Sequence, residues 1–338
     1  MIDAEETPTE WPAWWQKLAP AERERAVPAE PPAHAQLMKA VLERTSFSDP
    51  EWIFERKLDG IRCLAIRTGA QTIMLSRNDL DLAHRYPEVR EALAKQPSDR
   101  FAVDGEVVAF DGAQTSFARL AQRGRRPVPV FFYVFDLLWL DGVDIRALEL
   151  RTRKRLLSST IRFEDPLRLT THRNRDGEAM FAEACRKGWE GVIAKRADSP
   201  YRETRSRDWL KFKCEAGQEL VIGGFTAPRG SRTDFGALLV GYYDDGQLRY
   251  AGKVGTGFDR ATLHELGRRL NELRRDESPF ADPGSIRERG VTWVRPELVA
   301  QLGFTEWTTA GRLRHPRFLG LRDDKPAREV VREAVRGR

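Results

Sequence analysis

The alternation of apolar and polar residues predicts β-strands over much of the chain after residue 50. The predicted strands are rich in aromatic and branched residues and lie at 52–67, 101–112, 128–142, 191–196 and 208–214. Two of them, 101–112 and 128–142, end in an Asp-Gly pair that favours a turn. Residues 176–188 instead show helical spacing that ends at Gly188. These elements predict a mixed α+β block.

Beyond residue 218 the apolar runs become shorter and closer together. Strands are predicted at 220–227, 236–246, 248–258 and within 292–308, with a helix at 261–276 between them. Short strands with one inserted helix are typical of a small β-barrel. We expect a boundary near 216–219 and therefore three parts: a lead-in segment 1–50, a first domain 51–217 and a barrel domain 218–338.

Basic residues outnumber acidic ones, with 57 Lys and Arg against 51 Asp and Glu, a formal net charge of +6 and a sequence pI near 9.3. Arginine supplies most of this charge, since the chain has 46 arginines and 11 lysines. The planar guanidinium matches phosphate, so the composition is consistent with a polyanionic partner. Charge alone leaves a purely compositional origin equally open.

Composition excludes several classes of protein. A hydrophobic content of 41% is sufficient for ordinary cores, which excludes a globally disordered chain. No apolar run approaches the roughly 20 residues of a membrane span, and the acidic start differs from a secretory signal. We therefore expect a cytoplasmic protein without membrane contact. The distant cysteines Cys63, Cys185 and Cys214 predict neither a zinc site nor a disulfide framework, and the histidines show no metal-ligand spacing.

Several of the few lysines lie in short motifs. Lys57 precedes an Asp-Gly turn, with Glu55 two residues earlier on the same face of a predicted strand. Taken alone, this KxDG sequence is a weak signal. Lys211 and Lys213 also share one strand face, which is unfavourable unless an anion lies between them. These spacings predict an anion-binding site.

The ordered motifs KxDGxR, SRN, DGE, FxxFD, EGxxxK, WLKxK and RxDK occur together along the chain. In this order they resemble the covalent nucleotidyltransferases, which comprise DNA ligases, RNA ligases and mRNA capping enzymes. The resemblance covers about residues 50–332 and is greatest to bacterial ATP-dependent DNA ligases of the ligase D and ligase C kind. It implies an α+β fold: an adenylation domain of antiparallel sheets and helices, followed by an oligonucleotide-binding (OB) fold β-barrel domain.

The resemblance also implies roles for the residues that would hold the nucleotide. Lys57 would attack the α-phosphate of ATP and become lysyl-AMP. Glu55 would accept a hydrogen bond from the adenine amine, and Phe135 and Ile193 would cover the two faces of the ring. Arg62 and Glu106 would hold the ribose.

The remaining matched residues would act on phosphate and metal. Arg77 would contact phosphate, and Arg205, Lys211 and Lys213 would neutralise its charge during catalysis. Glu190, helped by Asp59, would bind Mg²⁺ or Mn²⁺, with Asp59 close to the reacting groups. Arg322, Asp324 and Lys325 would orient pyrophosphate when the OB domain closes.

These expectations predict an ATP-dependent DNA ligase that seals nicks between a 3′-OH and a 5′-phosphate. The resemblance implies a role in bacterial double-strand break repair by end joining, with nicked duplex DNA, the Ku protein and a repair polymerase as partners. We expect a monomer in the bacterial cytoplasm that acts at the nucleoid. Two alternatives are an RNA ligase or mRNA-capping-type nucleotidyltransferase, and a non-catalytic OB-type DNA-binding module. Glu55, as an adenine acceptor, disfavours a guanine-specific capping enzyme.

Overall fold

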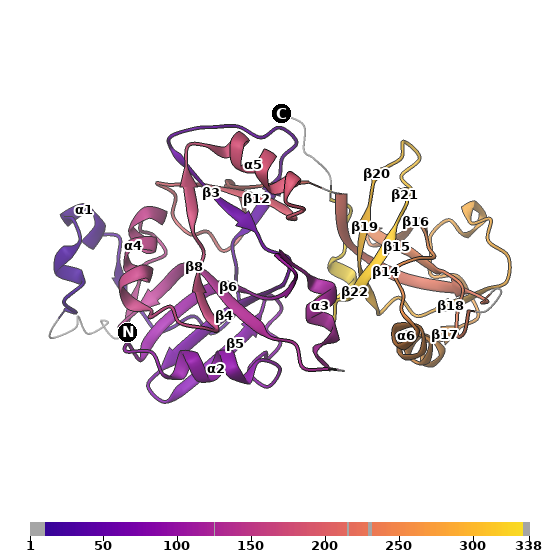
Figure 1. Ribbon diagram of the computed structural model, residues 1–338, viewed down its shortest axis with the longest axis horizontal. Coiled ribbons are helices and arrows are strands. Elements are labelled where there is room, and N and C mark those ends of the chain that lie inside the picture. Colours follow the sequence, from indigo (N-terminus) through magenta and orange to yellow (C-terminus); the bar gives the residue numbers. More distant parts are fainter. Residues whose placement is uncertain (1–10, 125, 215, 229–231, 334–338) are drawn as a thin grey trace, which may run out of the picture. The chain divides into compact units, whose positions relative to one another are not determined.

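The computed structural model describes residues 11–124, 126–214, 216–228 and 232–333, which divide into two compact units. The described residues up to Cys214 form the first unit, and those from residue 216 to residue 333 form the second. In Figure 1 the first unit runs from indigo to rose and the second from orange to yellow. No described helix is long and apolar enough to cross a membrane.

The first unit contains two sheets, of which the first is built mainly from antiparallel neighbours. Its strand order is β1-β9-β8-β6-β4-β5, with β10 parallel to β8 and β7 beside β6. The strands are β1 (Val27–Pro28), β4 (Ile61–Thr68), β5 (Gln71–Ser76), β6 (Arg100–Asp111), β7 (Gln114–Thr115), β8 (Val130–Leu140), β9 (Val143–Asp144) and β10 (Leu167–Leu169).

The second sheet has the order β11-β3-β12-β13-β2. Its strands are β2 (Lys39–Leu42), β3 (Trp52–Lys57), β11 (His172–Asn174), β12 (Gly191–Arg196) and β13 (Arg205–Lys213). The single strand predicted over 52–67 is therefore wrong, because β3 ends at Lys57 and β4 begins at Ile61 in the other sheet. A Cβ on Gly60 would lie 2.2 Å from the carbonyl oxygen of Val107, so this crossing between sheets needs glycine.

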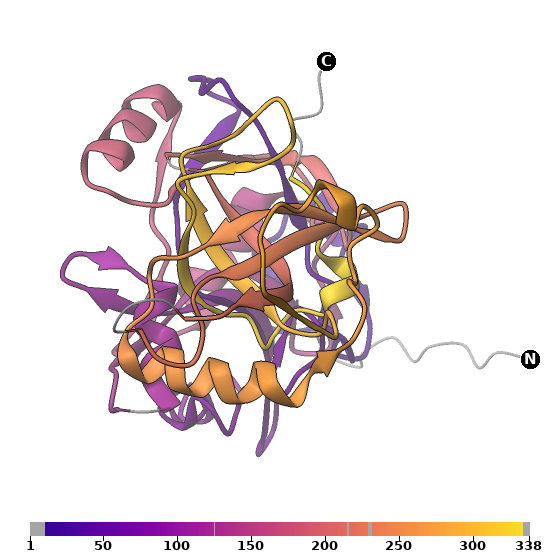
Figure 2. The ribbon, with the colours of Figure 1, turned by 90° about the vertical axis from the view of Figure 1, so that its right-hand side faces the viewer.

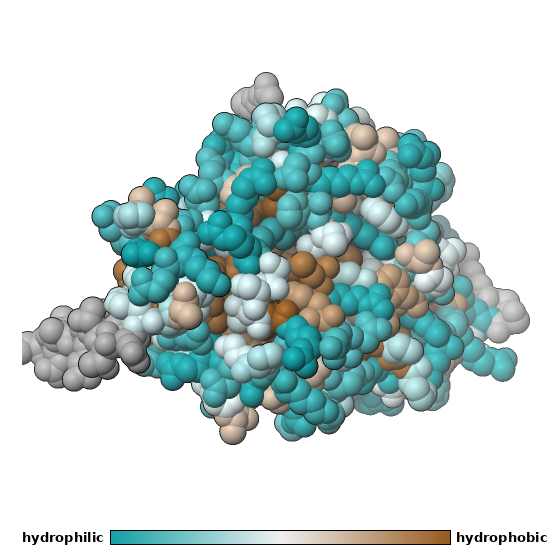
Figure 3. Space-filling model, turned by 60° about the vertical axis from the view of Figure 1, so that its left-hand side comes forward, coloured by the Kyte–Doolittle hydropathy of each residue, from teal (hydrophilic) through white to brown (hydrophobic). Residues whose placement is uncertain are grey.

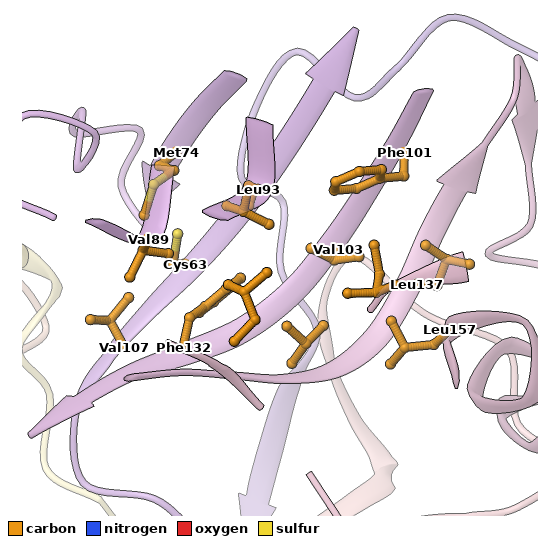
Figure 4. Packing of buried hydrophobic residues seen from close by; sticks show 14 of the residues in the cluster. Cys63, Met74, Val89, Leu93, Phe101, Val103, Val107, Phe132, Leu137 and Leu157 are labelled. Carbon is orange, nitrogen blue, oxygen red and sulfur yellow. The ribbon is translucent and has the colours of Figure 1, made fainter. Parts of the chain in front are cut away.

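Helices cover the outer faces of these sheets. The helices are α1 (Pro20–Arg23), α2 (Pro87–Ala94), α3 (Phe117–Ala121), α4 (Leu150–Thr160) and α5 (Gly177–Arg186). Val89 and Leu93 of α2 and Leu157 of α4 pack with Phe132 and Val103 of the first sheet, as Figure 4 shows. Helix α5 covers the second sheet in the same way, since its Met180 and Ala184 belong to a core with strand residues of β3, β12 and β13.

Residues 11–50, which the sequence analysis treats as a lead-in, contribute to this unit. Strand β1 pairs with β9, and β2 pairs in parallel with β13. Trp15 is buried in the core of the first sheet, with Trp11 and Trp14 packed against it. The Trp14 indole also donates a hydrogen bond to Asp141 at 2.9 Å. The three tryptophans therefore pack against the body of the first unit.

The second unit is a small β structure with one long described helix. Its largest sheet has the order β16-β15-β14-β18-β17, and β19 joins β14 to β22. The strands are β14 (Ala216–Thr226), β15 (Leu238–Asp244), β16 (Gln247–Val254), β17 (Arg274–Arg275), β18 (Val291–Val294), β19 (Val299–Phe304) and β22 (Arg317–Leu321), with the separate hairpin β20 (Glu306–Trp307) and β21 (Leu313–Arg314). Helix α6 (Arg260–Glu272) packs its leucines into the core of these strands. It is the long orange helix in Figure 2.

The face in Figure 3 is mainly hydrophilic, with hydrophobic residues in patches between polar ones. Among the described residues, the exposed large hydrophobic side chains are Val27, Leu80 and Val331. Cys185, at the end of α5, and Cys214, after β13, form a disulfide. The sequence-based expectation of no disulfide was wrong because residues separated by 29 positions are brought together only by packing of α5 on the second sheet.

A buried ion pair connects α4 to β8. The Arg153 guanidinium donates to both carboxylate oxygens of Asp136 at 2.8 and 2.9 Å, and both side chains have no exposed surface. Arg153 also donates to the carbonyl oxygens of Leu148 and Ser199. Removing one member of such a pair leaves an unpaired buried charge, which is costly.

We predict that Arg153→Met lowers the free energy of unfolding of the first unit by about 3–5 kcal/mol, measured by urea denaturation. The matched control is Arg155→Met on the same helix, since the Arg155 side chain is 62% exposed. The control should change stability by no more than about 0.5 kcal/mol. Equal losses in both variants would contradict the role given to the buried pair.

Candidate active site

The register of the second sheet gathers five of the predicted site residues on one face. Lys57, Gly191 and Lys213 lie directly opposite one another on β3, β12 and β13. Glu55, Ile193 and Lys211 form the next row. Side chains two residues apart on a strand share a face, so these two rows point to the same side of the sheet. The alternate residues, such as Phe54 and Phe212, pack under α5 on the other side.

Lys57 forms an ion pair with Glu190, whose Oε1 lies 2.5 Å from the lysine Nζ. The two side chains are 18% and 26% exposed, so both can meet a ligand. Gly191, the next residue, has a φ of +152°. A Cβ added to it would lie 1.8 Å from the carbonyl oxygen of Phe212. No larger residue fits there. This glycine lets the chain bring Glu190 to the end of β3.

Asp59 lies two residues after Lys57 and has bonds within the protein. Its carboxylate accepts a hydrogen bond from the Phe117 N–H at 2.8 Å, and its own N–H donates to Thr115 Oγ1 at 3.1 Å. The carboxylate therefore anchors the start of α3 to the turn that contains the KxDG motif. Among the described residues, no group of three or more His, Cys, Asp and Glu side chains could form a metal cage.

Arg62 and Glu106 face each other across β4 and β6, as expected for two residues with a shared ligand. Arg62 is held by Asp104, which accepts hydrogen bonds from the guanidinium at 2.5 and 2.6 Å. Burial alone would lower the pKa of Arg62, but Asp104 raises it above its ordinary value. Asp104 itself is fully buried and also accepts a hydrogen bond from the Tyr201 hydroxyl at 2.7 Å. Asp104 therefore holds the Arg62 side chain in a fixed orientation.

Glu55 lies in the interior between the sheets, only 2% exposed. Its carboxylate forms ion pairs with Lys154 and, at 2.6 Å, with Lys195. Burial alone would raise the pKa of Glu55, yet the two ammonium groups hold it below its ordinary value. Phe135, the predicted stacking residue, is 8% exposed and has the Arg62 guanidinium carbon 4.6 Å from its ring centroid. The two residues predicted to recognise adenine are thus in one charged environment.

The other predicted residues lie at other places in the fold. Arg77 is in the turn after β5, and the exposed Arg205 begins β13 and donates to the carbonyl oxygen of Ala40 at 2.6 Å. The remaining three residues lie in the second unit, after β22: Arg322, Asp324 and Lys325. There the Arg322 guanidinium binds both oxygens of Asp324 at 2.8 Å, and Lys325 lies 3.2 Å from Glu219.

Three further residues support the site and carry no role in the motif-based prediction. Asp104 is part of the DGE motif but was given no role, although it orients Arg62. Lys154 and Lys195 were given no role either, although both bind Glu55. Lys195 is the last residue of the EGxxxK motif, so the motif itself was the signal. Lys154 lies on α4, where Leu150, Leu156 and Leu157 have the spacing of a helix face, but no helix was predicted there.

Comparisons with known proteins give matches over most of the chain. Residues 32–213 match the family model of the ATP dependent DNA ligase domain, and residues 231–325 match the ATP dependent DNA ligase C terminal region. The chain is 41% identical over 296 residues to the multifunctional non-homologous end joining protein LigD of Pseudomonas aeruginosa, covering 85% of this chain and 35% of that protein. It is 41% identical over 288 residues to the LigD DNA repair protein of Mycobacterium tuberculosis, covering 84% and 38%.

A solved structure of mycobacterial DNA ligase D complexed with ATP and MES is also similar. It aligns with a TM-score of 0.64 and 37% identity, over 88% of this chain and 97% of that chain. The chain spans between 35% and 40% of the length of its LigD relatives. Together with the observed sheets, these matches confirm the predicted fold class, an α+β nucleotidyltransferase domain followed by an OB-fold domain.

We predict that Asp104→Asn weakens binding of an adenine nucleotide by at least about tenfold, or roughly 1.4 kcal/mol, measured by isothermal titration calorimetry. The amide cannot accept both guanidinium bonds of Arg62, so the arginine loses its fixed orientation. Asp111→Asn is the matched control, because Asp111 is an exposed residue at the end of the same strand. An unchanged affinity in Asp104→Asn would show that orientation of Arg62 is not needed for nucleotide binding.

Proposed function

Since this chain belongs to the ATP-dependent DNA ligase family, we propose that it seals nicks in duplex DNA through a covalent AMP intermediate on Lys57. The observation that carries this proposal is the environment of Lys57. It ends a strand on the face that also bears Lys211 and Lys213, and its amine is held 2.5 Å from Glu190.

In the first step, the neutral amine of Lys57 attacks the α-phosphorus of ATP. The new N–P bond replaces the bond from phosphorus to pyrophosphate, which leaves, and the nitrogen gives up one proton to solvent as the phosphoramidate forms. Glu190 fixes the position of the Nζ atom before the attack. Lys211 and Lys213 lie on the same face and supply positive charge for the phosphate oxygens, where charge builds up in the transition state.

The adenosine part is recognised by the remaining residues of the first unit. Glu55 accepts the hydrogen bond of the adenine amine, and Phe135 and Ile193 cover the ring. Arg62, fixed by Asp104, and Glu106 lie opposite each other and bind the ribose hydroxyls. An acceptor at the adenine amine supports ATP over GTP, and this disfavours the capping-enzyme alternative. It leaves an RNA ligase as the second candidate.

Two carboxylates near Lys57 fit a hard divalent cation. Mg²⁺ is usually held by one or two carboxylates together with phosphates of the substrate, so Glu190 and Asp59 form a suitable donor set for Mg²⁺ or Mn²⁺. When bound, the metal would neutralise charge on the phosphate oxygens. The carboxylate of Asp59 accepts the Phe117 N–H, which fixes its position beside the turn after Lys57.

The later steps act on DNA. AMP passes from Lys57 to the 5′-phosphate of a nick, and the 3′-OH then attacks that phosphate and releases AMP. Arg77 and Arg205 contact phosphate groups in these steps. The second unit offers further positive charge, because a hollow of about 520 Å³ is lined by residues that include Arg232, Lys253 and Arg289. This binding capacity alone would also fit a non-catalytic DNA-binding module, whereas the arrangement around Lys57 supports an enzyme.

The LigD relatives support a place for this chain in non-homologous end joining, because their names describe multifunctional proteins of that process. The proposed partners are nicked duplex DNA, a Ku protein and a repair polymerase. The enzyme would work as a monomer in the bacterial cytoplasm, at the nucleoid.

We predict that Lys57→Ala abolishes both labelling of the chain by α-³²P-ATP and nick sealing from ATP. Lys57→Arg should fail as well, because a guanidinium stays protonated and cannot act as a nucleophile. Retention of the label is measured by denaturing electrophoresis, which keeps only covalent adducts. Lys187→Ala, at a lysine that is 55% exposed, is the control and should be labelled like the unmodified chain. Full labelling of the Lys57→Ala protein would place the adduct elsewhere.

We predict that Lys325→Ala impairs loading of Lys57 from ATP far more than sealing of a nick that already carries AMP. Lys325 belongs to the segment proposed to orient pyrophosphate, a group that is present only in the first step. Single-turnover sealing of the two substrates separates the steps. Arg295→Ala, an exposed site in the same unit, serves as control. Equal loss with both substrates would refute this division of labour.

A further inference from the structure

One ammonium group connects the two residues proposed to recognise adenine. The Nζ atom of Lys154 donates a hydrogen bond to the carbonyl oxygen of Phe135 at 3.1 Å and forms an ion pair with Oε1 of Glu55. Phe135 lies on β8 of the first sheet and Glu55 on β3 of the second. The Lys154 side chain is only 8% exposed. Lys154 therefore sets the spacing between these two residues across the interior.

The second oxygen of the same carboxylate is held from another strand. Lys195 of β12 lies 2.6 Å from Oε2 of Glu55 and is 2% exposed. Its Nζ also stands 4.2 Å from the ring centroid of Phe135 and 4.0 Å from that of Trp209, within the range of cation–π attraction. Each oxygen of Glu55 thus has its own cation, and the plane of the carboxylate is fixed from two sides.

Forming such a buried cluster of charges costs free energy. Burying two ammonium groups beside one carboxylate costs desolvation energy that packing does not return. Burial, together with the neighbouring Lys154, lowers the pKa of Lys195 to about 8. A cluster of this cost is expected where a defined protonation state is needed for recognition.

The protonation state in question is that of Glu55. An ionised carboxylate has only acceptor sites, and each of its oxygens keeps a second lone pair after binding one cation. It can accept a hydrogen bond from an exocyclic amine but repels a carbonyl oxygen at the same position. A protonated carboxyl could donate a hydrogen bond instead, and it would then tolerate a base with either an amine or a carbonyl oxygen at that position.

We propose that Lys154 and Lys195 are positioning residues that set the purine specificity of this enzyme, by holding Glu55 as an oriented, acceptor-only group beside Phe135. The inference rests on the proposed function, since it assigns the adenine to this place. Arg153 supports it, because the residue before Lys154 binds Asp136, the residue after Phe135, in a bidentate pair. Two consecutive residues of α4 therefore hold two consecutive residues of β8.

The test compares ATP with purine riboside triphosphate, which has hydrogen in place of the 6-amine. Dissociation constants are measured by calorimetry, and adduct formation is measured in single turnovers with each nucleotide. The unmodified chain should prefer ATP. Lys154→Met should reduce this preference by at least about tenfold, chiefly through weaker ATP binding, because the 6-hydrogen analogue makes no bond to Glu55. Lys154→Arg should restore part of the preference, and Lys187→Met should leave it unchanged.

Other outcomes overturn the proposal. A Lys154→Met protein that loses affinity for both nucleotides equally would show a purely structural role. Lys195→Met provides an independent reading if Lys154→Met does not fold, and it should also lose the preference for ATP. If the unmodified chain binds both nucleotides equally, the specificity role is wrong even when the adduct forms. If it prefers ATP but forms no adduct, the proposed ligase function fails while the specificity role stands.

Discussion

The close approach of the chain at Gly60 to the backbone of β6 is the constraint on which the site depends. A Cβ at this position would lie 2.2 Å from the carbonyl oxygen of Val107. Because glycine allows this contact, the chain can leave the second sheet at Lys57 and enter the first at Ile61 within a few residues. Lys57 is thereby placed at a strand end, where its amine is accessible to a ligand. Arg62 lies on the other sheet only five positions later in the chain. One tight crossing thus leaves only a short turn between Lys57 on one sheet and Arg62 on the other.

The interior between the sheets is unusually rich in charge, and each buried carboxylate there has a basic partner. Asp104 holds Arg62, Asp136 holds Arg153, and Glu55 is bound by two lysines. Buried pairs of this kind add little net stability compared with apolar residues of the same size. What they supply is geometry, since a bidentate pair fixes the direction of both side chains. The first unit thus has an interior that orients ligand-binding residues as well as supporting the fold.

Much of the fold could be predicted from local patterns, and the exceptions have physical reasons. Residues 191–196 form β12 with the predicted bounds, because turns at 187–188 and 197–198 lie close to both ends of the strand. The run 52–67 has strand-forming residues on both sides of Asp59-Gly60, and this Asp-Gly pair was the local signal for the break between β3 and β4. Helix α4 was missed because its core positions are interrupted by buried Arg153 and Lys154, which look like surface residues in the sequence. The candidate site was predictable only where motifs marked it. The cations around Glu55 become visible once α4 and β12 are placed in space.

The order in which strands pair has a consequence for synthesis of the chain. The first sheet joins β4, β5 and β6, which follow one another closely, whereas β3 pairs with β12 and β11, and β2 pairs with β13. Contacts between residues far apart in sequence form late, because closing a long loop costs conformational entropy before these contacts contribute favourable free energy. On a ribosome, β3 must therefore wait unpaired until residues 172–174 and then 191–196 have emerged, and β2 must wait for residues 205–213. We expect the first sheet to collapse early and to act as the template on which the strand that bears Lys57 is finally captured.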